Sequence, residues 1–249
     1  MQRYFVNQDA ELNQRFFITD ENDVHHMTHV MRFTTEDEII VTCHNQRVFR
    51  CQIVNIDGQG VEVYSSAELS NDTELPVHVT ICSGLLKADK YEWLLQKSTE
   101  LGATAFYPTQ MERSVVKLSG AKVDKKVARW QKIVKEAAEQ SYRLIVPEIA
   151  FQTRLTSVLQ HSDDFDYILI AYEDAAKQGE TEQLKAVVSK VAPGSRILFV
   201  FGPEGGLSEA EVASFGKRAH TVGLGPRILR AETAPLYALS ALSYALELK

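Results

Sequence analysis

The sequence predicts an α/β protein in which a mostly parallel sheet is covered by helices and preceded by a small all-β domain. From residue 77 onwards, apolar runs of strand length alternate with helical segments, which is the pattern of a parallel sheet with helical crossovers. Before that point, residues 38–66 hold strand-like runs separated by turn signals. The 249 residues, of which 45% are hydrophobic and 24% charged, suffice for one large or two smaller domains.

The first 70 residues are predicted to form the small β domain. Strands are expected over 38–43, 47–56 and 60–66, with turns at His44-Asn45 and in the stretch DGQG. Residues 71–76 are polar, acidic and end in proline, which predicts a linker between the two domains. The second domain is then expected to cover residues 77–249.

A short helix is expected over 23–33, where His25, His26 and His29 accompany a stripe of valine and methionine. His25 and His29 are one helical turn apart, but the sequence nearby offers no third ligand and no activating glutamate, so we expect no metal site. Three cysteines, Cys43, Cys51 and Cys82, lack C-x-x-C spacing and stand in predicted strands. They are expected to be small buried residues rather than disulfide or zinc ligands.

The elements of the second domain alternate regularly along the chain. The predicted order is strand 77–85, helix 89–101 ended by Gly102, strand 104–109, helix 123–142, strand 165–173, helix 180–191 and strand 195–200. A further helix is expected to begin at Ser208, because Glu211 follows it with the spacing of a capping box.

A glycine-rich turn, FGPEGG at 201–206, stands between a strand and a helix, where open α/β sheets bind ligands. Phosphate-binding loops attract anions with backbone N–H groups and a lysine, but this turn carries Glu204 and no lysine or arginine between Arg196 and Lys217. The charge favours a neutral or cationic ligand. An ordinary loop is the alternative, since Gly-Pro and Gly-Gly are common turn sequences.

A second Gly-Pro turn supports the binding interpretation. The stretch HTVGLGPRILRAETAP at 220–235 again runs from a strand through Gly225 and Pro226 into a polar segment with Arg227, Arg230 and Glu232. A long apolar helix follows it. The two turns can wall one pocket built largely of backbone, which suits an adenine and a small polar tail.

Five blocks of the chain resemble the RsmE family, whose members are SPOUT-class methyltransferases acting on uridine N3 in 16S ribosomal RNA. The blocks are FGPEGGLSEAEV, LGPRILRAETA, YEWLLQKSTELGA, ERSVV and RWQKIVKEAAEQSYR, in the family's order along nearly the whole chain. The resemblance implies a trefoil-knotted parallel sheet with helices on both faces, preceded by a PUA-like β-barrel that binds RNA. The knot is implied by the resemblance alone, because true knots are very rare among protein chains in general.

The resemblance also implies S-adenosylmethionine as the cofactor, whose positive sulfonium is compatible with Glu204. The residues implied to bind it are Phe201, Gly202, Pro203, Glu204, Gly205, Gly206, Leu224, Gly225, Arg227, Ile228, Leu229, Thr233 and Ala234. Whether Glu204 faces the donor or holds the loop stays open at this point.

Methylation of uridine N3 needs a positioned base edge and help with the proton that N3 carries. Glu204 and Glu232 are the candidate carboxylates, and Arg227 and Arg230 can stabilise the negative charge that develops on the flanking carbonyls. We take Arg230 and Glu232 as the catalytic pair. An ion pair that merely fixes the loop is the alternative for Arg230.

The net charge of −6 disfavours a nucleic-acid partner, but its distribution favours one. Residues 113–143 carry nine basic residues against three acidic ones. A solvated helix face would look the same, and the family resemblance decides for 16S ribosomal RNA or the small subunit as the partner. The expected RNA-binding residues are Arg32, Arg113, Lys117, Lys122, Lys125, Lys126 and Arg129.

The last helix, APLYALSALSYALEL at 234–248, is apolar around most of its circumference. One sheet buries only one face of such a helix, so we expect a homodimer through it, with Leu239 and Leu242 at the interface. A helix enclosed within one protomer is the alternative. The chain shows no signal peptide and no apolar run of membrane-spanning length, so we expect a cytoplasmic protein without a membrane partner.

Two other functions remain as alternatives to the methyltransferase. The chain can be a catalytically idle module that binds ribosomal RNA, but the presence of Glu204, Arg227, Arg230 and Glu232 favours the enzyme. A dinucleotide-dependent dehydrogenase is disfavoured because G-P-E-G-G lacks the spacing G-x-G-x-x-G.

Overall fold

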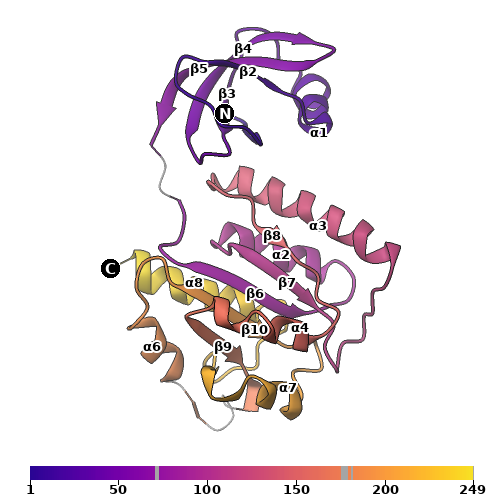
Figure 1. Ribbon diagram of the computed structural model, residues 1–249, viewed down its shortest axis with the longest axis vertical. Coiled ribbons are helices and arrows are strands. Elements are labelled where there is room, and N and C mark those ends of the chain that lie inside the picture. The colour runs from indigo at the N-terminus through magenta and orange to yellow at the C-terminus, as the bar shows by residue number, and fades with distance from the viewer. Residues whose placement is uncertain (71–72, 175–178, 181, 249) are drawn as a thin grey trace. The chain divides into compact units, whose positions relative to one another are not determined.

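The computed structural model describes residues 1–70, 73–174, 179–180 and 182–248 (Figure 1). It separates into two compact units, and each is described here by itself. The N-terminal unit comprises residues 1–74 and 138–145, and the C-terminal unit comprises 75–137 and 146–249. Residues 71 and 72 of the predicted linker, and residue 181 of the predicted helix 180–191, lie outside the described residues.

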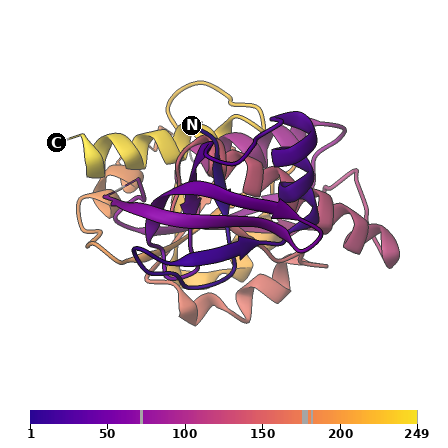
Figure 2. The same ribbon diagram turned by 90° about the horizontal axis from the view of Figure 1, so that it is seen from above.

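The N-terminal unit is built on a sheet with a long antiparallel hairpin. The strand order is β1 (Arg3–Phe5), β3 (Glu38–Thr42), β4 (Val48–Asp57), β5 (Gly60–Leu69), β2 (Arg15–Ile18). β1 runs parallel to β3 and the other neighbours are antiparallel; β4 and β5 lie side by side in both ribbon views (Figures 1 and 2). The strands predicted over 38–66 are confirmed. β1 and β2 were not predicted, because so short a strand shows too little alternation to be recognised.

Alternating apolar residues of these strands form the core of the N-terminal unit. Ile39, Val41, Phe49 and Val63 are fully buried, together with Met27 from the helical segment. Cys43 and Cys51 lie in the same core, and Cys82 is buried in the C-terminal unit. Burial raises the pKa of each of these three thiols to about 12. The prediction of small, buried cysteines is confirmed.

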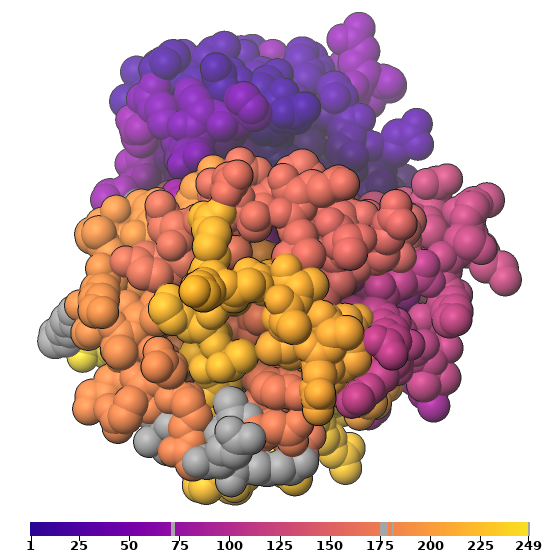
Figure 3. All heavy atoms as spheres, turned by 60° about the horizontal axis from the view of Figure 1, so that its bottom comes forward, coloured from indigo at the N-terminus to yellow at the C-terminus, as the bar shows by residue number. Residues whose placement is uncertain are grey.

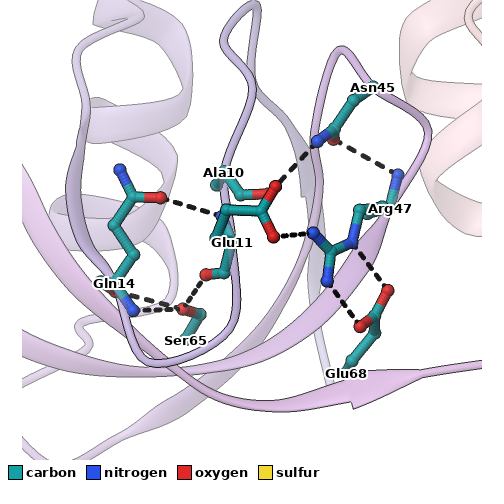
Figure 4. Close-up of polar contacts among 7 residues, drawn as sticks. All are labelled: Ala10, Glu11, Gln14, Asn45, Arg47, Ser65 and Glu68. Carbon is teal, nitrogen blue, oxygen red and sulfur yellow. Dashed lines mark hydrogen bonds and ion pairs between the residues drawn. The ribbon is translucent and has the colours of Figure 1, made fainter.

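Arg47 connects the two ends of the hairpin to a neighbouring loop (Figure 4). Its guanidinium donates to both carboxylate oxygens of Glu68, at 2.8 and 2.7 Å, and forms an ion pair with Glu11. Asn45 donates to the carbonyl of Ala10 at 3.1 Å in the same cluster. These contacts fix the loop before β2 against the end of the sheet, because Arg47 binds the fork of one carboxylate and a second carboxylate at once.

The helix predicted over 23–33 begins earlier and ends earlier than expected. It consists of α1 (Glu21–His25) followed by a π-helical turn, η1 (His26–Val30). Its start is set by Asp20, whose Oδ1 accepts from the N–H groups of Asn22 and Asp23 at 3.0 Å each. The rings of His25 and His29 stack with their centroids 4.7 Å apart.

The C-terminal unit contains a parallel sheet, as predicted. Among the described residues its order is β11 (Ala219–Val222), β9 (Tyr167–Ala171), β10 (Arg196–Phe201), β6 (His78–Gly84), β7 (Ala105–Thr109), β8 (Glu148–Ile149). All these neighbours pair in parallel. The helices that the structure describes are α2 (Lys90–Glu100), α3 (Ala121–Gln140), α4 (Leu155–Leu159), α6 (Gln183–Val188), α7 (Glu209–Ser214) and α8 (Ala234–Glu247), with short 3-10 turns at η2 (Ser162–Asp164) and η3 (Gly216–Arg218).

Helices cover both faces of this sheet, which confirms the predicted fold class (Figure 1). Successive residues of a strand point to opposite faces. Accordingly Phe199 and its alternate neighbours in β10 pack with α2, α3 and α8, whereas Leu198 and Val200 pack on the side of α4 and α7. Burial on both faces explains why β10 is a continuous apolar run.

The connections around β10 bring distant segments together. β10 lies between β6 and β9, and β11 returns to the far side of β9. After β11 the chain passes to α8, which packs on α2 and β10. The trefoil knot that the resemblance implies at this crossing stays a prediction.

Candidate functional site

A pocket of about 530 Å³ lies at the carboxyl ends of β9, β10 and β11 in the C-terminal unit. β9 stands between the other two strands, so the three strand ends adjoin one another. Orange and gold atoms, which belong to the later part of the chain, occupy the middle of the face seen in Figure 3. The position is the one where open α/β sheets bind ligands, and the volume is that of a small-molecule site.

The first wall is the glycine-rich turn after β10. A Cβ on Gly202 would lie 2.7 Å from both the carbonyl carbon of Gly206 and the nitrogen of Leu207, and Gly206 itself has a φ of +70°. After the turn, Ser208 caps α7: its hydroxyl accepts from the N–H of Glu211 at 3.2 Å, and its N–H donates to the Glu211 carboxylate at 2.9 Å. The predicted capping box is confirmed, and glycine is required where the loop closes on itself.

Glu204 holds this turn to a second segment. Its Oε1 accepts a hydrogen bond from the backbone N–H of Lys87 at 3.1 Å, in the connection between β6 and α2. The carboxylate therefore fixes the loop, which was one of the two roles considered for it. Contact between Glu204 and a bound donor stays a prediction.

Arg113 belongs to the pocket wall. Its Nη1 donates to the carbonyl of Gly205 at 3.1 Å, and the adjacent N–H of Glu112 donates to Glu211 at 2.8 Å. These two hydrogen bonds join the segment that carries Arg113 to the glycine-rich turn and to α7. Its predicted RNA contact stays a prediction, but its position beside the pocket was not expected.

The second wall is the loop from residue 223 to 233, where Gly225 has a φ of +86°. Its first residue is held by Glu180, whose Oε2 accepts from the N–H of Gly223 at 2.6 Å. The other oxygen of Glu180 accepts from the N–H groups of Glu182 and Gln183 at the start of α6. Burial raises the pKa of Glu180, but the N–H groups of Gly223, Gln183 and Glu182 outweigh it, so that the pKa lies below its usual value.

Glu232 ends this loop and pairs with Lys90 at the start of α2. Lys90 Nζ lies 3.1 Å from Glu232 Oε1. Glu232 is only 8% exposed, and its Oε2 is enclosed without a hydrogen-bond partner among the described residues. Burial raises the pKa of Glu232, yet its own backbone N–H, Lys90 and the positive charge of Arg230 outweigh burial and bring the pKa below its usual value. The carboxylate is therefore ionised at neutral pH.

The structure brings almost every predicted cofactor-binding and catalytic residue into one pocket. The lining includes the predicted cofactor-binding residues of both loops and the predicted catalytic residues Arg230 and Glu232. Thr233 is not among the lining residues in the described chain; it is the N-cap residue of α8. The lining residues that lie outside the two predicted loops are Lys90, Arg113, Ala171, Tyr172, Glu173, Asp174, Leu207 and Val222.

The residues after β9 could have been found from the strand order. Tyr172, Glu173 and Asp174 follow directly on a strand that lies between the two strands carrying the predicted loops. The sequence shows that these three residues follow a strand. It does not show that this strand lies between the two strands that carry the predicted loops. Without that order, nothing distinguishes this strand end from that of β7.

The pocket wall carries both signs of charge. Lys90, Arg113, Arg227 and Arg230 are its cations, and four carboxylates, Glu173, Asp174, Glu204 and Glu232, balance them. Arg227 and Arg230 are exposed, and neither side chain makes a hydrogen bond or ion pair with the residues that the structure describes. Such a wall can accept a ligand that itself carries separate positive and negative groups.

The predicted RNA-binding cations fall into distinct groups. Lys117, Lys122 and Lys125 are exposed and have no ion-pair partner within the described chain. Lys126 and Arg129 instead both bind Glu92, at 3.2 and 2.6 Å. Arg32 is exposed in the N-terminal unit, directly after the π-helical turn, with a φ of +55°. Among the described residues, the three lysines of the first group and Arg32 have no ion-pair partner, whereas the charges of Lys126 and Arg129 are shared with Glu92.

The described residues hold neither a metal centre nor a membrane-spanning helix. No group of three or more histidine, cysteine or acidic side chains is placed to hold a metal ion within that part of the chain. In the same residues no helix combines the length and the apolar character needed to cross a membrane.

Comparison with known proteins agrees with this architecture. A family model for an RNA methyltransferase domain matches residues 73–243, and a model for the PUA domain of RNA methyltransferases matches residues 18–63. The ribosomal RNA small subunit methyltransferase E of Bacillus subtilis (strain 168) is 49% identical over 252 aligned residues, covering 100% of this chain and 98% of the relative.

Solved structures resemble the whole chain. A crystal structure described as that of a hypothetical protein is 47% identical, with a TM-score of 0.91 and 99% of each chain covered. The ribosomal RNA small subunit methyltransferase E of Neisseria gonorrhoeae, crystallised with bound S-adenosyl methionine, is 29% identical, with a TM-score of 0.81, covering 98% of this chain and 97% of that one. The chain therefore belongs to the RsmE family of RNA methyltransferases and has a PUA-like N-terminal domain.

Proposed function

We propose that this protein transfers a methyl group from S-adenosylmethionine to N3 of a uridine in 16S ribosomal RNA. The observation that carries the proposal is the pocket itself, which two glycine loops and the end of β9 enclose at the carboxyl edge of the sheet. The relatives named small subunit methyltransferase E support the substrate, and the Neisseria structure with its bound cofactor supports the donor.

The residues of the pocket fit S-adenosylmethionine. Its first wall needs glycine at two positions: a Cβ on Gly202 would meet the backbone of the same loop, and Gly206 has a φ of +70°. Such a turn can offer backbone groups to an adenine. Carboxylates from three segments suit the amino, hydroxyl and sulfonium groups of the donor, and the unpaired guanidinium of Arg227 suits its carboxylate. The predicted cofactor-binding residues of the two loops would hold the cofactor together with Tyr172, Glu173 and Asp174 after β9.

Bound S-adenosylmethionine supplies an electrophilic methyl group. The electron pair of N3 forms the new N–C bond while the sulfur keeps the electrons of the bond that breaks, and the N3 proton goes to solvent. The new bond takes the direction of the old N3–H bond, so no side chain can remain on that axis during transfer. The chain therefore acts by positioning the base and by stabilising the charge that spreads to O2 and O4.

Of the pair predicted to be catalytic, we propose that Arg230 acts on the substrate and that Glu232 positions the residues around it. Arg230 lines the pocket with an unpaired guanidinium, which can face a uracil oxygen as it gains negative charge. Glu232 is ionised and enclosed, and it holds a lysine beside the site. The two residues thus differ in role: the Arg230 guanidinium, which attracts Glu232 but makes no ion pair with it, can face the substrate, and the Glu232 carboxylate organises the wall.

The proposed RNA contacts are the cations of the segment 113–129 and Arg32. Lys117, Lys122 and Lys125 carry the strongest expectation, because their charges are unpaired among the described residues. The PUA-like domain, which we assign to residues 1–70 with a linker over 71–76, is proposed to hold the same RNA. A ribosomal substrate implies that the protein works in the cytoplasm.

We also propose a homodimer through α8, but with a different contact surface from the one predicted. Leu239 and Leu242 were expected at the interface, and this was wrong: both are fully buried in the core of the C-terminal unit. The outward stripe of α8 holds Tyr237, Tyr244 and Leu248, which are 40%, 71% and 70% exposed. An exposed apolar stripe on a terminal helix is suited to a two-fold contact.

Calorimetry with purified protein and S-adenosylmethionine tests the donor site. We expect saturable binding that is lost in Gly202→Ala, because a methyl group there collides with the backbone of the same loop. Wild-type protein that binds RNA but shows no heat with the donor would instead identify a catalytically idle RNA-binding module.

A further inference from the structure

Lys90 is a lysine in an unfavourable place for its own helix. It is the first residue of α2, where the helix dipole favours anions, and its side chain is 40% exposed beside the pocket. The helix gains no stability from a cation at this end. The surroundings of Lys90 must therefore explain why a lysine occupies this position.

Its surroundings are an ionised carboxylate on one side and the pocket on the other. Glu232 accepts one N–H of the ammonium at 3.1 Å and is itself almost fully buried. An ammonium group has three N–H donors, and the residues that the structure describes provide no second side-chain partner for it. Two donors remain for a ligand, and the buried carboxylate determines where they lie.

We propose that Lys90 is a catalytic residue that donates to a carbonyl oxygen of the target uracil, and that Glu232 is the residue that positions it. This rests on the proposed function, the methylation of uridine N3. Loss of the N3 proton places negative charge on O2 and O4, and an ammonium already held at one of these oxygens lowers the free energy of that state. Lys90 and Arg230, from two different segments, can then face the two oxygens that flank N3.

Because Lys90 is paired with Glu232, a neutral carbonyl oxygen that gains charge during the reaction is a better partner for Lys90 than a carboxylate oxygen that is already charged. A ligand carboxylate at Lys90 would be repelled by Glu232, and the unpaired Arg227 is a better partner for it. A neutral carbonyl is not repelled, and its attraction to the ammonium grows as the charge develops. Such an interaction stabilises the transition state more than the bound ground state.

The test compares Lys90→Met, Lys90→Arg and Glu232→Gln with wild type in kcat/KM across pH, together with donor affinity by calorimetry. Lys97→Met is the matched control: Lys97 lies on the same helix and pairs with Glu100, outside the pocket. We expect Lys90→Met to lower kcat/KM near neutral pH by about a hundredfold, as for the loss of one transition-state donor. The deficit should shrink as pH rises, because more uridine then ionises without help.

Donor affinity should stay within about twofold of wild type in Lys90→Met, and Lys90→Arg should recover most of the rate. Glu232→Gln should show the same pH signature with a smaller loss, since the lysine remains but is no longer held. If Lys90→Met instead weakens donor binding and its loss of kcat/KM is the same at every pH, the proposal is overturned. Lys90 would then bind the carboxylate of the donor. If Lys90→Met lowers kcat/KM by the same factor at every pH and donor affinity is unchanged, the proposal is overturned and Lys90 has a structural role. A separate result would contradict the proposed function itself: RNA treated with wild-type protein that contains no N3-methyluridine.

Discussion

Gly84 and Pro203 lie so close together that no side chain fits between them: a Cβ on Gly84 would be 2.5 Å from the nitrogen of Pro203 and 2.6 Å from its Cδ. The contact joins the end of β6 to the first glycine loop of the pocket. Gly84 is thus a position where the site requires glycine for close approach rather than for an unusual φ.

Replacement of Gly84 by alanine should therefore displace the first loop. We expect a loss of about 1–3 kcal/mol in the free energy of unfolding, as for other overpacked positions, and weaker donor binding. Gly58→Ala is the matched control, because a Cβ there meets nothing within 4 Å and its φ is ordinary. Denaturant unfolding and calorimetry measure both effects, and equal behaviour of the two variants would contradict the close approach.

Gly84 also shows what could not be predicted from the sequence. FGPEGG was recognised because a glycine-rich turn between a strand and a helix is a local pattern, and the capping box of Ser208 and Glu211 was predicted for the same reason. Gly84 owes its importance to Pro203, which is distant in sequence. Lys90 and Glu232 are similarly remote, so their pairing depends on a strand order that periodicity does not reveal.

The last helix illustrates a different limit. Its apolar circumference predicted a second covered face, which stays a prediction, and Leu239 and Leu242 proved to be core residues. A helix rich in leucine and alanine has no polar face to mark which side meets its own sheet. The large exposed tyrosines mark the other side only once the packing is known.

The three unpaired lysines should dominate the salt dependence of RNA binding. Replacing Lys117, Lys122 and Lys125 together by glutamine should reduce the slope of log affinity against log salt by roughly 2–3, at 0.7–0.9 for each phosphate contact. Lys126→Gln with Arg129→Gln should reduce it less, since Glu92 already binds both. Filter binding across a salt series measures the slopes, and a triple variant with the wild-type slope would leave these lysines as a solvated surface.

Glu180 should make the second loop sensitive to acid. Its folded-state pKa lies below the usual value, so its stabilising contribution is present above the unfolded pKa of about 4.3 and is lost as pH falls through the folded pKa. Wild type should therefore lose stability more steeply than Glu180→Gln below about pH 4.3. Glu182→Gln, at an exposed position two residues away, is the control. Coinciding pH curves for wild type and Glu180→Gln in thermal unfolding would refute the role of Glu180.

The outward stripe of α8 should determine the oligomeric state. Tyr244→Lys places a charge on a side chain that is 71% exposed, so the fold should survive while a two-fold contact is disrupted. Light scattering should show a dimer for wild type and a monomer for this variant. Leu12→Lys, at another exposed apolar position, should leave the mass unchanged. A monomeric wild type at micromolar concentration would remove the dimer from the account.

Identification of the modified nucleoside is the decisive experiment for methyl transfer to uridine N3. Small subunits and free 16S ribosomal RNA from cells that lack this protein are incubated with it and with S-adenosylmethionine carrying an isotopically labelled methyl group. The RNA is then digested and analysed by mass spectrometry against nucleoside standards. We predict labelled N3-methyluridine at one position of the RNA, absent when Gly202→Ala replaces wild type. Label in any other nucleoside, or none although the donor binds, would contradict the proposed function.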